Sequence, residues 1–383
     1  MAIEKSGSEV YAYGNAAEFK VTKLWFPNGQ LSSTVTEISR AQPIDPDRYQ
    51  EALHDINESW SVAEDEPTGQ QFELALANTD ADFSAGVDLE VSTFSSSLSN
   101  NPGNAVEFAE NSALHPDRPR LYLASPGNGK TSYWTPAEQR HIKVTGRFTD
   151  EGGRPLPTIA ALARVLEQAE LPVSRISTNS AGGAYATALM SVLPEGRLSH
   201  AYIKSRPNIS DHPAGLAWGA TVLLGDMLDD RRHSRVSADP WRLTQDTIKA
   251  AKKELPRLYS EDSARNEARR VPEATKTHGL KKMYTDLLAL SRGQTYGNVG
   301  PAAQDTGLAL RRQPEARLTY HVPTRDRLYR ERADIDRFME QVRQLGGVAA
   351  RHSLEALIVP GSHRDHTAYP ALRWSLETYA FSR

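Results

Sequence analysis

The stretch Pro172-Val-Ser-Arg-Ile-Ser-Thr-Asn-Ser-Ala-Gly-Gly-Ala-Tyr-Ala-Thr-Ala-Leu-Met190 decides the fold of this chain. Apolar and polar residues alternate from Val173 to Ile176, directly after a proline, and this pattern predicts a strand. The small and apolar residues from Ala184 to Met190 predict the start of a buried helix. Ser180 stands between the two, followed by Ala181 and two glycines. The stretch therefore predicts a serine on a sharp turn from strand to helix.

A serine on such a turn presents its hydroxyl outward, and the N-terminus of the next helix faces the negative charge that develops on a substrate. This arrangement resembles the nucleophile elbow of the α/β-hydrolases, whose pattern is G-x-S-x-G. Here the residues read Thr178-Asn-Ser180-Ala-Gly182. A threonine thus replaces the first glycine, and it crowds the contact between strand and helix. The resemblance is to the superfamily and not to a particular protein.

Length and composition limit the classes of protein that the chain can represent. Its 383 residues suffice for one large α/β domain with an insertion or for two domains. A net charge of -3 gives no electrostatic reason to expect nucleic acid or an anionic membrane as a partner. The absence of cysteine excludes disulfides, thiolate catalysis and cysteine-based metal sites. The N-terminus lacks the apolar segment of a signal peptide and no apolar run could span a bilayer, so we expect a cytoplasmic location.

Strand and helix patterns alternate along the centre and the end of the chain, which predicts a parallel sheet with helices on both faces. We expect strands at 19–26, 87–94, 120–124, 173–176, 198–204, 316–322 and 356–359, and helices at 48–57, 106–114, 156–169, 184–190, 333–345 and 370–381. The expected fold class is α/β: an α/β-hydrolase-like, mostly parallel sheet with helices on both faces and a helical cap insertion.

The expected domain organisation follows from a change of pattern after residue 210. Residues 1–210 form the N-terminal part of the core, 211–312 a helical cap, and 313–383 the C-terminal part of the core. The middle segment has helical patterns and many arginines and lysines. These are either solvated helix faces or a cap that covers the site and helps to select an anionic or polar substrate.

Two further segments follow predicted strands and carry the residue types of a catalytic triad. Asp326 comes after the strand that ends at Val322, and His363 after the strand that ends at Val359. Open parallel sheets place functional groups beyond the carboxyl ends of their strands. The chain order Ser180, Asp326, His363 resembles the nucleophile, acid and histidine of the α/β-hydrolase triad. In that chemistry a neutral imidazole takes the serine proton and a carboxylate orients the imidazole.

Each member of this triad has an alternative. His366 lies three residues beyond His363 and can serve as the base instead. Asp326 stands between two arginines, where an aspartate commonly forms a surface ion pair, and Asp211 is the alternative acid. The two histidines have the spacing of a metal site but lack an obvious third ligand, so we expect no metal.

The segment Ala124–Thr131 supports the interpretation as a hydrolase and also permits a second interpretation, a nucleotide-binding loop. Its position in the resemblance implies that the N–H of Asn128, with that of Ala181, forms the oxyanion hole. The same residues match the loose phosphate-loop pattern A-x-x-x-x-G-K-[ST], which needs a helix to start at its lysine. Pro136 disfavours a helix in the residue before it and is expected to open a new helix that Thr135 caps.

These features predict a serine hydrolase that acts on a carboxylic ester, or a related thioester or amide, through an acyl-enzyme. The expected partner is a small-molecule acyl substrate, with no cofactor, nucleic acid or membrane. Two alternatives stay open: a nucleotide-binding protein that uses Ala124–Thr131, and an inactive hydrolase fold that serves as a binding or structural protein. The sequence indicates neither the substrate nor the oligomeric state.

Overall fold

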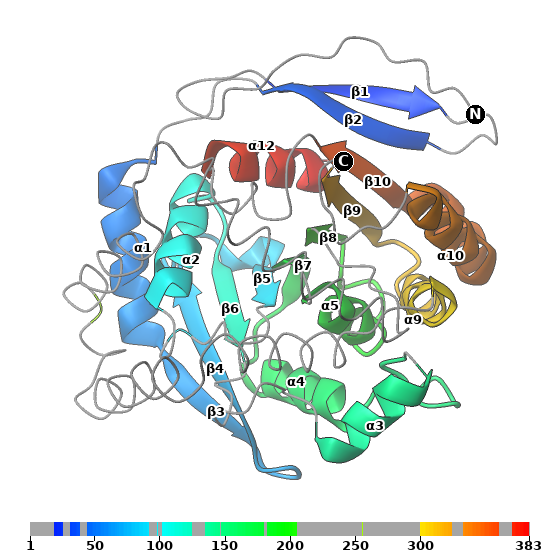
Figure 1. Ribbon diagram of the computed structural model, residues 1–383. Coiled ribbons are helices and arrows are strands. Elements are labelled where there is room, and N and C mark those ends of the chain that lie inside the picture. The colour runs from blue at the N-terminus through cyan, green and yellow to red at the C-terminus, as the bar shows by residue number, and fades with distance from the viewer. Residues whose placement is uncertain are drawn as a thin grey trace, which may run out of the picture.

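A single ten-stranded sheet organises the protein (Figure 1). The computed structural model describes residues 19–25, 31–38, 44–91, 98, 102–124, 135–145, 147–179, 182–204, 255, 299–323, 332–359 and 370–382. The strands are β1 Phe19–Trp25, β2 Leu31–Ile38, β3 Ser61–Asp65, β4 Gln70–Ala77, β5 Val87–Val91, β6 Arg120–Ala124, β7 Val173–Asn179, β8 His200–Lys204, β9 Arg317–Pro323 and β10 Leu354–Val359. Their order across the sheet is β1-β2-β10-β9-β8-β7-β5-β6-β4-β3.

The centre of the sheet is parallel, as the alternating pattern predicted. Parallel pairing runs without a break from β6 through β5, β7, β8, β9 and β10 to β2. Antiparallel pairing occurs only toward the two ends of the described sheet, where β4 pairs with β6, β3 with β4, and β1 with β2. The carboxyl ends of the central strands therefore meet at one edge.

Helices cover both faces of this sheet (Figure 1). One face carries α1 Pro46–Ser59, α2 Pro102–Leu114 and α12 Pro370–Phe381. The other carries α4 Pro157–Gln168, α5 Gly182–Met190, α9 Val299–Arg312 and α10 Arg332–Ser353, with α3 Pro136–Thr145 beside α4. A short 3-10 helix, Phe83–Ala85, precedes β5. The doubly covered sheet confirms the predicted α/β class.

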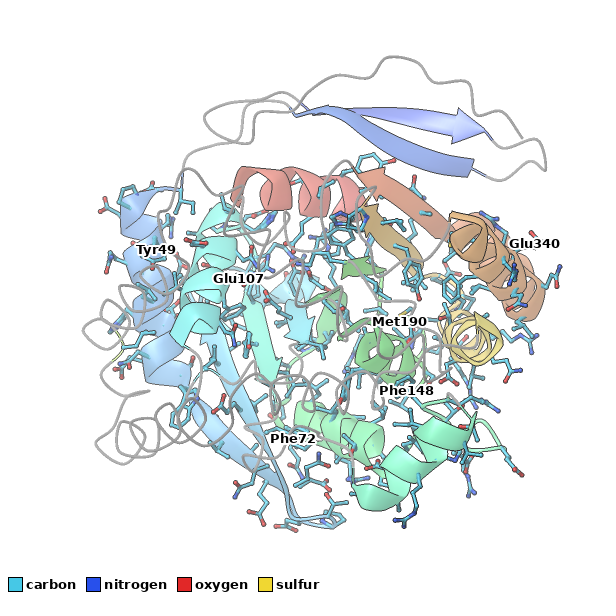
Figure 2. All side chains as sticks on the ribbon, viewed as in Figure 1. Tyr49, Phe72, Glu107, Phe148, Met190 and Glu340 are labelled. Carbon is cyan, nitrogen blue, oxygen red and sulfur yellow. The ribbon has the colours of Figure 1, made fainter. Side chains whose placement is uncertain are left out.

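The larger hydrophobic core lies between the sheet and α4, α5, α9 and α10. Figure 2 labels Phe72, Phe148 and Met190, which belong to this core, whereas Glu340 on α10 is exposed at the outside. The predicted apolar face of α4 is confirmed, since its apolar residues at helical spacing are all buried. A side chain of this kind stabilises the fold by about 1.5–3 kcal/mol when it is fully buried.

The chain departs from the sequence expectation mainly at its N-terminal end. β2, β3 and β4 were not predicted, and the helix expected at 48–57 is present as the longer α1. β3 is an edge strand with largely exposed residues, so it lacks the apolar alternation that marks a half-buried strand. The helix expected at 106–114 begins earlier, at Pro102.

The predicted cap lies largely outside the described residues, and the division into domains stays a prediction. Within the segment 211–312, the structure describes Leu255, which is buried, and α9. α9 packs against α5 and α10, and the contact with α10 is close at Gly307. A Cβ added there would lie 2.7 Å from the Leu345 Cβ, so only glycine lets these helices approach in this way.

Candidate active site at the carboxyl edge of the sheet

The predicted turn from strand to helix is present at the centre of the sheet. β7 ends at Asn179 and α5 begins at Gly182, so Ser180 and Ala181 alone separate strand from helix. β7 lies between β5 and β8 and is parallel to both. Ser180 and Ala181 themselves lie outside the described residues. The flanking elements confirm the local structure that was predicted around them.

The threonine that departs from the elbow pattern is built into the strand. Thr178 pairs in register with Val91 of β5 and Ile203 of β8, and it is buried. Its Oγ1 atom has no hydrogen-bond partner among the described residues. The side chain is therefore enclosed by protein directly before the turn, at the place where the hydrolase pattern has a glycine.

The strands that precede the other two predicted triad residues end at the same edge. In register, Asn179 of β7 is opposite Lys204 of β8, which is opposite His321 of β9, and β9 continues only to Pro323. β10 ends opposite that proline. Neighbouring strands lie about 4.8 Å apart, so the end of β9 is roughly 10 Å from the end of β7 and that of β10 roughly 14 Å.

The predicted acid and base follow these strand ends closely in the chain. Asp326 comes three residues after β9, and His363 comes four residues after β10. Both lie outside the described residues, as do the alternatives Asp211 and His366 and the predicted oxyanion residue Asn128. Their assignment stays a prediction.

The helix predicted to begin at Pro136, after the segment that contains Asn128 and Lys130, is confirmed as α3. Thr135 caps α3, because its Oγ1 accepts a hydrogen bond from the Glu138 N–H (3.2 Å) and the Glu138 carboxylate accepts one from the Thr135 N–H (2.7 Å). Glu138 also accepts from the N–H and the hydroxyl of Thr158. One carboxylate thus joins the start of α3 to the start of α4.

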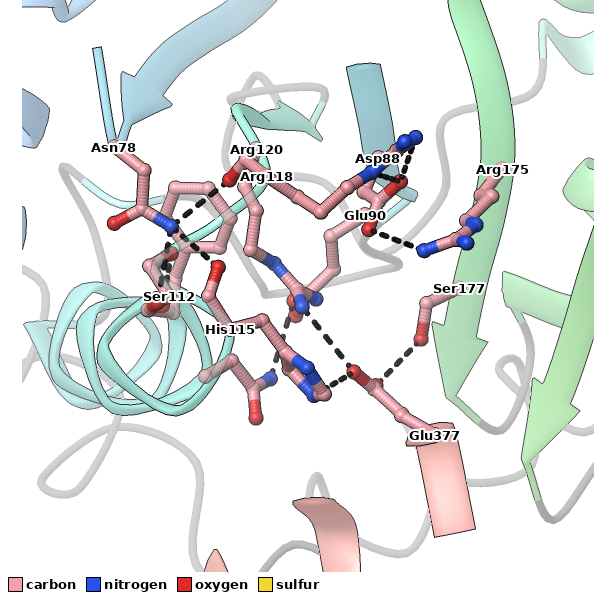
Figure 3. Close-up of polar contacts among 12 residues, drawn as sticks. Asn78, Asp88, Glu90, Ser112, His115, Arg118, Arg120, Arg175, Ser177 and Glu377 are labelled. Atoms are coloured by element: carbon pink, nitrogen blue, oxygen red, sulfur yellow. Dashed lines mark hydrogen bonds and ion pairs between the residues drawn. The ribbon is translucent and has the colours of Figure 1, made fainter. Parts of the chain in front are cut away.

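A buried cluster of charged groups, not expected from the sequence, lies under α12 (Figure 3). The Glu377 carboxylate accepts hydrogen bonds from Ser177 Oγ (2.8 Å), Lys204 Nζ (2.9 Å) and Arg120 Nη1 (3.2 Å). The His115 Nε2 atom lies 3.5 Å from the same carboxylate. We call these five residues the Glu377 cluster.

The charges of this cluster compensate one another. Burial alone would raise the pKa of Glu377, but the attraction of Lys204 and Arg120 outweighs it and holds that pKa well below its ordinary value. Burial likewise opposes the charge of Arg120, and the attraction of Glu377 and Glu90 raises its pKa instead. Glu377 is therefore an ionised carboxylate between two cations.

Further polar side chains of the central strands face the same side. Asp88 of β5 accepts from Arg118 (2.9 Å) and lies 3.7 Å from Arg175 of β7. The Tyr202 hydroxyl of β8 lies 3.0 Å from His321 Nδ1 of β9, and the two rings are stacked. Burial raises the pKa of Tyr202 well above its ordinary value, so its phenol is neutral.

Part of the signal for these residues was present in the sequence, because Asp88 and Glu90 stand at alternate positions of the predicted strand 87–94. In a strand that buries only one of its faces, such residues usually face water. In this protein α2 and α12 cover them. Within the part of the chain that the structure describes, no group of histidine, aspartate and glutamate has the arrangement of a metal site. None of the described helices has the length and apolar character needed to cross a membrane.

Comparison with known proteins gives similar folds at low identity. No protein-family model matches the sequence, and no curated protein matches it. Among solved structures, an alpha/beta hydrolase enzyme from a Medee basin deep-sea metagenome library is 12% identical, with 84% of this chain and 98% of that one covered and a TM-score of 0.46. A carboxylesterase structure from the ammonia-oxidizing thaumarchaeon Nitrososphaera gargenis is 10% identical, with 84% and 98% covered and a TM-score of 0.48. The thioesterase domain from the curacin biosynthetic pathway is 15% identical, with 83% and 98% covered and a TM-score of 0.43.

The fold of this chain is that of the α/β-hydrolases. Its own topology carries this statement: a mostly parallel sheet, helices on both faces, and a turn from a central strand to a helix that contains a serine. A fold hosts many functions, so the activity must be argued from the site.

Proposed function

We propose that the protein is a serine hydrolase that acts on a carboxylic ester or a related acyl substrate. One observation carries the proposal: β7 and α5 are separated only by Ser180 and Ala181, at the centre of the parallel sheet. The N-terminus of α5 carries a partial positive charge toward this turn, which favours negative charge on a group bound there. Asp326 and His363 follow strands that end at the same edge, which supports their roles as acid and base.

The proposed reaction proceeds in two steps. The Ser180 hydroxyl attacks the acyl carbon while the His363 imidazole takes its proton, and the N–H groups of Asn128 and Ala181 hold the oxyanion of the tetrahedral intermediate. The imidazolium then protonates the leaving alcohol, thiol or amine, which leaves an acyl-enzyme. A water molecule attacks this ester, gives its proton to His363 and releases the acid, and the proton returns to Ser180. Asp326 orients the imidazole throughout.

Turnover of p-nitrophenyl acyl esters by matched variants tests this assignment. We expect Ser180→Ala to abolish turnover and Asp326→Asn and His363→Ala to lower kcat by about 10³-fold or more, with little change in the far-ultraviolet circular dichroism. His366→Ala and Asp211→Asn are the controls and should retain activity within a few-fold. A loss in His366→Ala with an active His363→Ala would move the base to His366. Full activity in Ser180→Ala would contradict the proposal.

A further inference from the structure

We propose that Glu377 is a positioning residue for the reaction. It fixes α12, the helix that begins seven residues after His363, against β7, the strand that ends one residue before Ser180. The inference rests on the proposed function for its effect on the reaction. Its structural part, a fixed link between α12 and β7, stands on the described residues alone.

A single carboxylate joins α12 to three strands of the sheet, and Figure 3 shows it with Ser177 and Arg120. Its Oε1 atom accepts from Ser177 of β7 and Lys204 of β8, and its Oε2 atom from Arg120 of β6. Glu377 itself is 0% exposed and Arg120 is 1% exposed. Moving α12 along the sheet would separate these charges in a dry environment, which is strongly unfavourable.

The position of the cluster lets it act on both proposed catalytic segments. Ser177 lies two residues before Asn179, where β7 ends, a distance of roughly 7 Å along a strand. Glu377 lies seven residues after Pro370, where α12 begins, which is roughly 10 Å along a helix. A rigid strand and a rigid helix therefore run from the cluster to the end of β7, one residue before Ser180, and to Pro370, seven residues after His363.

The other contacts of α12 with the sheet reach a different strand, or a residue of β7 that lies farther from Ser180 in the chain. Tyr379 donates to Glu355 of β10 (3.0 Å), which ties the helix to another strand. Arg175 of β7 lies over the ring of Phe381 at 5.1 Å, two residues farther from Ser180 than Ser177 is. Among the residues of β7 whose side chains the structure describes, Ser177 makes the contact with α12 that lies nearest to the turn.

The kinetic test uses two variants: Ser177→Ala removes this hydrogen bond and keeps the charges, whereas Glu377→Gln removes the charge of the carboxylate. We expect Ser177→Ala to lower kcat by about tenfold and Glu377→Gln by about 100-fold, with KM changed less than about twofold, because misplacement by about 1 Å can cost 10²-fold in rate. Thr149→Val is the matched control, since it removes a buried hydroxyl that donates to the Asp305 carboxylate (2.7 Å) far along the chain from either segment. It should lower the melting temperature as Ser177→Ala does and leave kcat unchanged.

A distance measurement makes the test independent of activity. The chain has no cysteine, so Glu195→Cys and Thr378→Cys, both at exposed positions, place one spin label after α5 and one on α12. We expect one narrow distance distribution in the otherwise natural chain and in Thr149→Val, and a broader one in Ser177→Ala and Glu377→Gln.

The outcomes separate the two claims. Unchanged distances in both cluster variants would overturn the link, and if Glu377→Gln does not fold, Ser177→Ala alone decides. Broadened distances with an unchanged kcat would overturn the positioning role. Broadened distances in a protein that hydrolyses no ester would leave the link standing and contradict the proposed function instead.

Discussion

The two faces of the central sheet are buried in different ways. Toward α4, α5, α9 and α10 the strands present apolar side chains such as Leu89, Ile176 and Ile203. Toward α2 and α12 the central strands present Asp88, Arg120, Ser177 and Lys204, and the last three meet the Glu377 carboxylate of α12. Both faces exclude water, although only one is hydrophobic.

The two kinds of burial have different consequences: one for the stability of the fold, the other for how precisely its elements are placed. Apolar burial is nondirectional, and a hydrophobic face accepts side chains of similar volume with little loss. Buried charges contribute little net stability over apolar replacements, but each requires a partner at a defined place. In this protein the directional face is the one on which the helix after His363 is anchored.

The largest expected effect comes from removing the charge at the centre of the polar face. Glu377→Gln leaves Arg120 and Lys204 buried without the carboxylate of α12, so we expect a loss of about 3–5 kcal/mol in the free energy of unfolding. Urea unfolding measures it. The double variant Glu377→Met with Lys204→Met should be more stable than Glu377→Gln, because both charges of one pair are gone. A double variant of lower stability would contradict the account of this face.

Neighbouring residues of β7 sharpen the comparison, since Ile176 and Ser177 point to opposite faces. Ile176→Val should cost about 0.5–1.5 kcal/mol of stability through lost packing and leave kcat unchanged. Ser177→Ala should cost about 1.5–3 kcal/mol, as the loss of a hydrogen bond to a charged group does, and should lower kcat. Urea unfolding with initial-rate kinetics on both variants gives the comparison. Equal kinetic effects would show that the faces do not differ in this respect.

A smaller effect is expected in the pH dependence of stability. Burial lowers the pKa of His200 from 6.5 to about 4, and Arg175 and Arg317 add to the shift. As the pH falls, the unfolded chain therefore binds this proton before the folded protein does. The contribution of neutral His200 is complete above pH 6.5 and declines as the pH falls toward 4. Urea unfolding of His200→Asn should show a shallower decline in this range, and an unchanged slope would assign the decline to other groups.

Much of the fold was predictable from the sequence because its strongest signals are local. β6 and α12 have the bounds that were expected, and the pattern around Ser180 predicted β7 and α5. The cap Thr135 and the helix start at Pro136 followed from residue types alone. Edge strand β3 escaped prediction because little of it is buried.

The Glu377 cluster could not be predicted, because its members are brought together only by the tertiary structure. Arg120 and Glu377 come from distant parts of the chain, and alternation along β5 indicates a polar face without showing what covers it. The predicted triad depends on the residues that follow the strand ends. The described strands β7, β9 and β10 end at one edge of the sheet.

The central claim is that Ser180 is a nucleophile, and covalent labelling tests it most directly. The protein is treated with a fluorophosphonate, and the modified residue is located by mass spectrometry of its peptides. We expect one adduct per chain, on Ser180, that is absent in Ser180→Ala and strongly slowed in His363→Ala. No adduct on the folded protein, or an adduct on another residue that persists in Ser180→Ala, would contradict the account.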